Sequence, residues 1–133
     1  MHSVIYWTEG GEGPYDIELE PEVRAWLDTL TKAEYRAVEL KADRLADNPT
    51  TLGEPWTRHL GGPVRELRFH LRGKAIRISY WLAPDRRLVL LTVFAKTRMR
   101  ERSEVARAMH AQKVCEAEHD PASHVYDRSF EEE

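Results

Sequence analysis

The 133 residues, of which 41% are hydrophobic and 32% charged, suffice for one hydrophobic core and are too few for two ordinary domains. No run approaches the roughly 20 apolar residues that cross a bilayer, and no basic region followed by an apolar core begins the chain, which excludes membrane proteins and favours a soluble cytoplasmic protein. The single cysteine, Cys115, excludes an internal disulfide, so the fold needs no oxidising compartment.

The first expected elements are short strands. Residues 1–14 contain an apolar run at positions 4–7 followed by a Gly-rich stretch, which indicates an N-terminal extension with an extra edge strand. Residues 15–19 alternate apolar and acidic side chains, which is typical of a strand buried on one face.

Two amphipathic helices follow. Pro21 suits a first helical turn, and apolar side chains recur with helical spacing through Leu30. Thr31 and Glu34 have the spacing of a capping box, which predicts the start of a second helix. That helix should end at Asn48, because Pro49 disfavours helical geometry in the residue before it.

The second half of the chain predicts three strands and a helix. After a loop over residues 50–62, strict alternation over 64–72 and 76–82 indicates a hairpin turning at Gly73-Lys74. Residues 88–95 are apolar at nearly every position, as in a central strand covered on both faces. Ser103 is expected to cap a helix through about residue 118, before a frayed acidic tail. The result is an α+β domain with helices on one side of an antiparallel sheet.

Charge is strongly segregated along the chain. Residues 1–54 carry 5 basic and 12 acidic side chains, residues 55–113 carry 14 and 4, and residues 114–133 carry 1 and 7. A basic block within an acidic chain indicates a surface that faces a polyanion, although a solvated basic face balanced by acidic neighbours gives the same pattern.

Residues 15–113 resemble the RelE/ParE superfamily of toxin–antitoxin systems, and within it the HigB-like branch of phage-derived, Gp49-like proteins. The resemblance rests on Leu52-Gly53-Glu54-Pro55, on residues 64–68, 73–80 and 90–96, and on a polar helix with Ala106 and Ala108. The family's paired lysines correspond to Lys96-Thr97 here. Residues 1–14 and 114–133, the latter comprising the end of the last helix and the acidic tail, flank this toxin domain.

The resemblance implies a RelE-like β-α-α-β-β-β-α fold, with a helical hairpin packed on one face of the sheet. It also implies a metal-independent endoribonuclease without cofactors, an mRNA interferase that cleaves mRNA in the ribosomal A site and so inhibits translation and growth. Its partner would be a cognate helix-turn-helix antitoxin that neutralises it.

Metal-free RNA cleavage requires a proton carrier for the attacking 2′-hydroxyl and cations that stabilise the phosphorane. Alternation places Arg68 and Arg77 on one face of a hairpin, where two guanidinium forks could clasp a phosphate. The predicted catalytic residues are Arg68, Arg77, Lys96 and His70, the last as proton carrier. The predicted RNA-binding residues are Arg65, Arg72, Lys74, Arg98 and Trp81. Arg77→Ala is expected to abolish toxicity and leave thermal stability nearly unchanged.

Several alternatives stay open at this point. Arg68 and Arg77 could form structural ion pairs with Glu66, which would then orient an arginine or act as a base. A ParE-like, gyrase-directed toxin or a non-catalytic RNA- or protein-binding module would share the fold. Cys115 and His119 could share a helix face with His110 as a distant third zinc ligand, but no CxxC or HExxH pattern supports a metal, and none is predicted.

Overall fold

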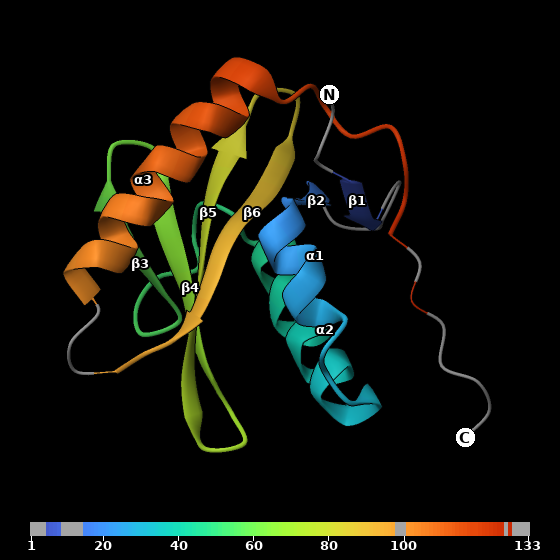
Figure 1. Ribbon diagram of the computed structural model, residues 1–133, viewed down its shortest axis with the longest axis vertical. Helices are drawn as coiled ribbons and strands as arrows, with labels where there is room; N and C mark the ends of the chain where they lie inside the picture. Colours follow the sequence, from blue (N-terminus) through green and yellow to red (C-terminus); the bar gives the residue numbers. More distant parts are fainter. Residues whose placement is uncertain (1–4, 9–14, 98–100, 127, 129–133) are drawn as a thin grey trace.

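The computed structural model describes residues 5–8, 15–97, 101–126 and 128. A six-stranded sheet carries three helices (Figure 1), which confirms the α+β class. In chain order the elements are β1 (Ile5–Thr8), β2 (Asp16–Leu19), α1 (Pro21–Leu27), α2 (Lys32–Asp47), β3 (Thr57–Gly61), β4 (Val64–Leu71), β5 (Lys74–Ala83), β6 (Arg87–Ala95) and α3 (Glu101–Glu118). None of these helices is long and apolar enough to span a bilayer.

The sheet has the strand order β1-β2-β6-β5-β4-β3 and is mixed. Four of its neighbouring pairs are antiparallel, but β2 pairs with β6 in parallel, so the expected fully antiparallel sheet is wrong at this position. The connection from β2 to β6 runs through two helices and three strands, so no tight turn dictates their relative direction. The loop expected over residues 50–62 contains β3, which returns into β4 through a turn where Gly62 has a φ of 49°.

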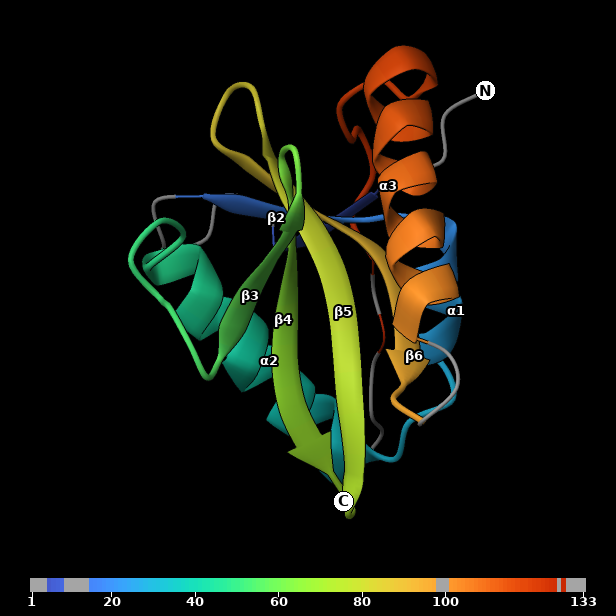
Figure 2. The same cartoon turned by 90° about the vertical axis from the view of Figure 1, so that its left-hand side faces the viewer.

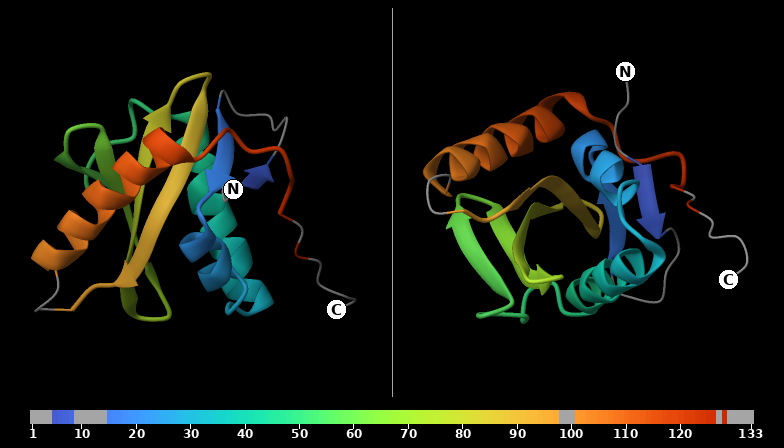
Figure 3. Two further views of the ribbon diagram at one scale, coloured as in Figure 1. Left: turned by 45° about the horizontal axis from the view of Figure 1, so that its top comes forward. Right: turned by 60° about the horizontal axis from the view of Figure 1, so that its bottom comes forward.

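The helices cover both faces of the sheet, which corrects the expectation that all of them lie on one side (Figure 3). The helical hairpin α1–α2 does pack on one face, where Val23, Leu27 and Leu45 join Ile78 and other inward residues of the strands in the main core. On the opposite face α3 covers a smaller cluster that includes Val64, Val89 and Leu91. The nearly continuous apolar sequence of β6 fits this two-sided burial.

Local sequence signals predict the start of α2 correctly and the start of α3 incorrectly. Thr31 and Glu34 form the predicted capping box at the start of α2, and Asn48 is its C-cap. The expected cap at Ser103 is wrong, because α3 already includes Glu101. Residues 98–100 lie outside the described part of the chain.

The chain after α3 is not frayed over its described residues. Tyr126 is buried in the main core, and its hydroxyl donates to Asp28 Oδ1 at 2.6 Å. The Arg128 guanidinium donates to the carbonyls of Leu27 and Leu30. This segment therefore packs against the connection between α1 and α2, which its acidic composition does not predict.

Candidate active site

Strands β4 and β5 run side by side and form a hairpin (Figure 2). Arg68 and Arg77 are direct cross-strand partners in its antiparallel register, so their side chains leave the same face of the sheet. The hairpin turns at Arg72 and Gly73, whose φ angles of 51° and 79° are those of a type I′ turn. The turn lies one residue earlier than Gly73-Lys74, and the register gives the shared arginine face that alternation predicts.

Glu66 lies beside both guanidinium groups. Its Oε1 is 3.8 Å from Arg68 Nε and 3.9 Å from Arg77 Nε, and its side chain is almost entirely buried. Burial raises the pKa of the Glu66 carboxyl, although the two arginines oppose this shift. Burial and the neighbouring Arg68 charge lower the pKa of Arg77. One carboxylate thus holds two cations in a partly desolvated cluster.

The two arginines keep hydrogen-bond donors that no described residue satisfies. Arg68 Nε and Arg77 Nε are both buried, and neither has a hydrogen-bond partner among the described residues. The distances to Glu66 are too long for hydrogen bonds. A buried donor without an acceptor costs about 1–3 kcal/mol, so the pair is poised to gain from an anion that supplies acceptor oxygens.

A pocket of about 390 Å³ adjoins this pair. It lies where β4 extends past the start of β3, and the Arg68 amide there donates to the Trp56 carbonyl at 2.8 Å. Although Arg77 is only 7% exposed, both its side chain and that of Arg68 line the pocket. The full lining consists of Lys41, Pro55, Trp56, Arg68, Phe69, His70 and Arg77. His70 is exposed here, so one hollow joins both arginines and an imidazole.

Sequence reasoning missed Trp56 and Lys41 as parts of this pocket. Trp56 is 39% exposed, and the Arg44 guanidinium lies 4.6 Å from its ring centroid. An indole held by a cation beside an anion pocket offers a stacking surface for a base. A tryptophan directly after Leu52-Gly53-Glu54-Pro55, in a stretch without apolar periodicity, was the available signal; Lys41, on α2, had none.

Three other predicted residues lie at the periphery. Lys96 is exposed just beyond β6, with its backbone amide bonded to the Ala75 carbonyl at 2.7 Å. Arg72 sits in the hairpin turn rather than on the strand, and its Nε is 2.8 Å from Glu34 Oε2. Lys74 is exposed at the start of β5. None of these three lines the pocket.

Two predicted RNA-binding residues lie away from the pocket, and a third cannot be placed. Arg65 has the parity of Leu67, projects from the opposite face, and donates to Thr57 Oγ1 at 3.1 Å. Trp81 shares the face of Arg77 but is only 6% exposed and packs in the cluster beneath α3, which leaves no ring face for a base. Arg98 lies outside the described residues.

The raised pKa of Glu66 predicts a pH effect on stability. A carboxyl whose pKa is higher in the folded than in the unfolded chain stabilises the fold below its ordinary pKa, and this contribution is lost as pH rises through the folded value. Glu66→Gln removes that titration, so stability of the variant relative to the wild type should increase with pH across this window. Urea unfolding of both proteins between acidic and neutral pH measures the difference, with Glu54→Gln, an exposed carboxyl, as control. A pH-independent difference would contradict the raised pKa.

The element order and the sheet topology are those of an α+β domain with a RelE-like fold. A family model described as "Phage derived protein Gp49-like (DUF891)" matches residues 25–114. The chain therefore belongs to the Gp49-like family, which is part of the RelE and toxin–antitoxin-like group and is associated with toxins of these systems. A search of curated proteins found no match.

Proposed function

We propose that this protein is a HigB-like toxin of a type II toxin–antitoxin system, a ribosome-dependent endoribonuclease that cuts mRNA in the ribosomal A site. The observation that carries the proposal is the pair of buried, unsatisfied Nε–H donors of Arg68 and Arg77 beside an open pocket. A phosphodiester supplies the acceptor oxygens that these donors lack. Membership of a toxin-associated family supplies the biological setting.

The arrangement suits transfer of the RNA phosphoryl group to its own 2′-hydroxyl. In this reaction the 2′-oxygen bonds to phosphorus, the P–O5′ bond breaks, and charge accumulates on the equatorial phosphate oxygens. Arg68 and Arg77 would neutralise that charge, and Glu66 would hold their guanidinium groups in place. His70 would accept the 2′-hydroxyl proton, and a water molecule would protonate the leaving 5′-oxygen. Trp56 would stack on a neighbouring base.

The proposal includes an antitoxin partner, a helix-turn-helix protein that neutralises the toxin. An acidic segment of that partner would complement the excess of basic over acidic residues between positions 55 and 113. Occupation of the arginine pocket by its carboxylates would exclude RNA by competition for the same donors. The ribosomal substrate places the action of the toxin in the cytoplasm.

Expression in a bacterium that lacks the antitoxin, followed by mapping of transcript ends, tests the proposal. We expect growth arrest with cuts in translated messages that keep a fixed phase relative to codons, and rescue when a neighbouring helix-turn-helix protein is co-expressed. Growth arrest with intact transcripts and a DNA-damage response would instead indicate a ParE-like, gyrase-directed toxin. Normal growth with well-folded protein would indicate a non-catalytic RNA- or protein-binding module, and either result would overturn the nuclease proposal.

A further inference from the structure

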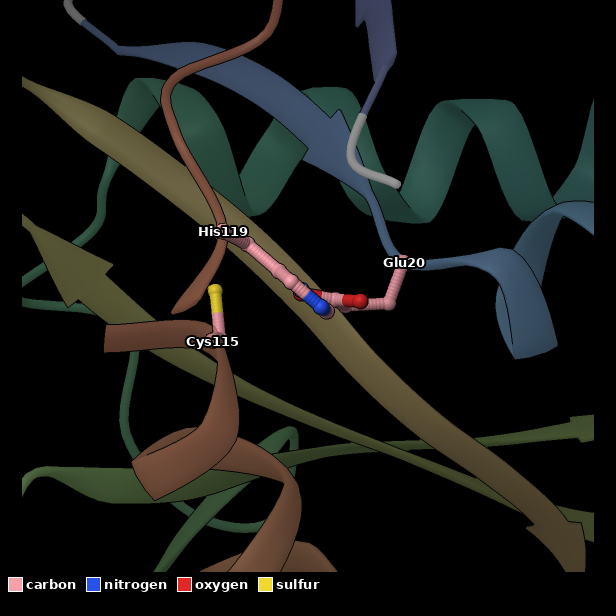
Figure 4. Close-up of side chains that lie close together, drawn as sticks. All are labelled: Glu20, Cys115 and His119. Carbon is pink, nitrogen blue, oxygen red and sulfur yellow. The ribbon is translucent and has the colours of Figure 1, made fainter. Parts of the chain in front are cut away.

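A second cluster of reactive side chains lies where the end of α3 meets the junction of β2 and α1 (Figure 4). Potential ligand atoms of Glu20, Cys115 and His119 all lie within 4.8 Å of one another. Cys115 and His119 are one helical turn apart, and the His119 amide donates to the Cys115 carbonyl at 3.0 Å. Glu20 comes from nearly 100 residues earlier in the chain, at the N-cap of α1. Helical spacing therefore supplies two of the donors and the tertiary fold supplies the third.

We propose that Glu20, Cys115 and His119 bind a zinc ion. Thiolate sulfur, imidazole nitrogen and carboxylate oxygen are the three donor types that zinc takes in proteins, and the mixed set suits zinc better than the hard cations calcium and magnesium. His110, which lies within α3, is exposed and is not part of the cluster. The site is separate from the arginine pocket, since Trp81 beside it follows Arg77 by four residues of β5, about 13 Å along the strand.

The buried carboxylate in the cluster faces the imidazole of His119 and the thiol of Cys115. Glu20 is 6% exposed and occupies the N-cap of α1, yet its side chain makes no capping hydrogen bond. Its Oε2 instead lies 2.7 Å from His119 Nδ1. A buried charge is costly unless it is paired, and a divalent cation between the three side chains would neutralise this carboxylate.

The Cys115 thiol is held protonated without a metal. Cys115 is 1% exposed, and burial together with the neighbouring Glu20 carboxylate raises the pKa of its thiol to about 12. This environment makes Cys115 a poor nucleophile, because the thiolate is the reactive form.

The indole N–H of Trp81 is a buried donor beside the cluster. Its indole Nε1 is buried without a hydrogen-bond partner among the described residues, and the Trp81 side chain is 94% buried. Trp81 and Cys115 line one pocket with His119. A metal-bound thiolate would accept this orphaned N–H, in the way that outer-shell donors orient and tune metal ligands.

Space for a fourth ligand adjoins two of the three side chains. Cys115 and His119 line a pocket of about 240 Å³ together with Asp120 and the cationic Arg87, whereas Glu20 does not line it. Three protein ligands and a water would complete a tetrahedral shell. On binding, the Cys115 thiol releases its proton and His119 carries its proton on Nε2, so that Nδ1 can coordinate. The Nδ1 to Glu20 Oε2 separation then opens to roughly 3.3 Å, the spacing of two tetrahedral zinc ligands.

Cobalt titration of the full, tag-free chain tests the site directly, because cobalt substitutes for zinc and reports thiolate coordination by absorbance. We expect one ion per chain, a near-ultraviolet charge-transfer band, displacement by zinc, and a higher Tm with zinc. Cys115→Ala should lose the band, and His119→Gln should weaken binding by about 100-fold or more. Trp81→Phe, which keeps the ring and loses the N–H, should weaken binding roughly 10-fold.

His110→Gln is the matched control, since it removes an exposed histidine from the same helix and should change neither band nor Tm. Absence of the band in folded wild type, or its persistence in Cys115→Ala, would overturn the proposal. The Glu20–His119 contact would then be only a hydrogen bond that anchors the end of α3. Growth arrest is a separate readout, so the failure of this site and the failure of the proposed nuclease function are distinguishable.

Discussion

Arg77→Lys is expected to reduce mRNA cleavage by about 100- to 1000-fold while the protein stays folded. Lysine keeps a positive charge near the buried Glu66 carboxylate but loses the planar fork and the Nε–H donor. The charge that develops on the phosphate in the transition state would then meet one guanidinium, that of Arg68, rather than two. Primer extension on messages in a reconstituted translation reaction measures the rate, and thermal unfolding measures the fold.

Arg77→Ala is a poorer test than the sequence alone indicates. Arg77 is 7% exposed, and its removal leaves Glu66 buried with one ion-pair partner fewer. Breaking a buried pair in this way costs about 3–5 kcal/mol, so the expectation of nearly unchanged stability for this variant is replaced by one of marked destabilisation. Lost toxicity in that variant would not separate chemistry from unfolding.

The matched control for Arg77→Lys is Arg36→Lys, which makes the same exchange at an exposed arginine of α2 that pairs with Glu39. The control should retain full cleavage and growth arrest. Arg68→Lys should reproduce the loss seen for Arg77→Lys, because the two guanidinium groups are cross-strand partners. Undiminished cleavage by a folded Arg77→Lys protein would remove this pair from the active site.

Local periodicity accounts for the parts of the fold that were predicted correctly. Strict alternation on each side of the Arg72-Gly73 turn gave β4, β5 and the shared face of Arg68 and Arg77. Helical spacing and the Thr31 capping box gave α1 and α2. These signals act within a few residues, where backbone geometry determines which side chains meet.

Long-range pairings were the parts that periodicity could not supply. The parallel pairing of β2 with β6 and the position of α3 over the second face depend on contacts between distant segments. Residues 57–61 form β3 only because β4 offers an edge to pair with, since their own sequence, Thr-Arg-His-Leu-Gly, carries no strand alternation.

In the candidate site, too, periodicity predicted the residues of one hairpin and missed those that depend on long-range packing. Alternation identified Arg68, Arg77 and His70, but it also assigned Trp81 to an open surface that α3 in fact covers. The parity of Arg65, which matches that of Leu67, already indicated the opposite face. Trp56 lies in a loop, and its place in the pocket depends on how that loop packs in the fold. Sequence periodicity therefore could not predict it.

His70→Gln is expected to slow cleavage by about 100-fold or more and to leave RNA affinity and thermal stability nearly unchanged. The side chain is exposed and lines the pocket with Arg68 and Arg77, so its loss removes a proton carrier without opening a core. The arginines, which supply the attraction for phosphate, remain in place. For His70→Gln we expect a lower catalytic rate at unchanged RNA affinity, which is the signature of a proton carrier. For Arg77→Lys, which weakens a phosphate contact, we expect both the catalytic rate and the RNA affinity to fall.

The contrast between two exposed histidines makes this test specific. His110→Gln, on α3, lies away from the pocket lining and should cleave at the wild-type rate. If His70→Gln cleaves equally fast, the carboxylate of Glu66 becomes the candidate proton acceptor beside the arginine pair. Glu66→Gln would then stop cleavage, whereas a Glu66 that only positions the guanidinium groups predicts a partial loss, because the glutamine amide oxygen keeps a partial negative charge beside them.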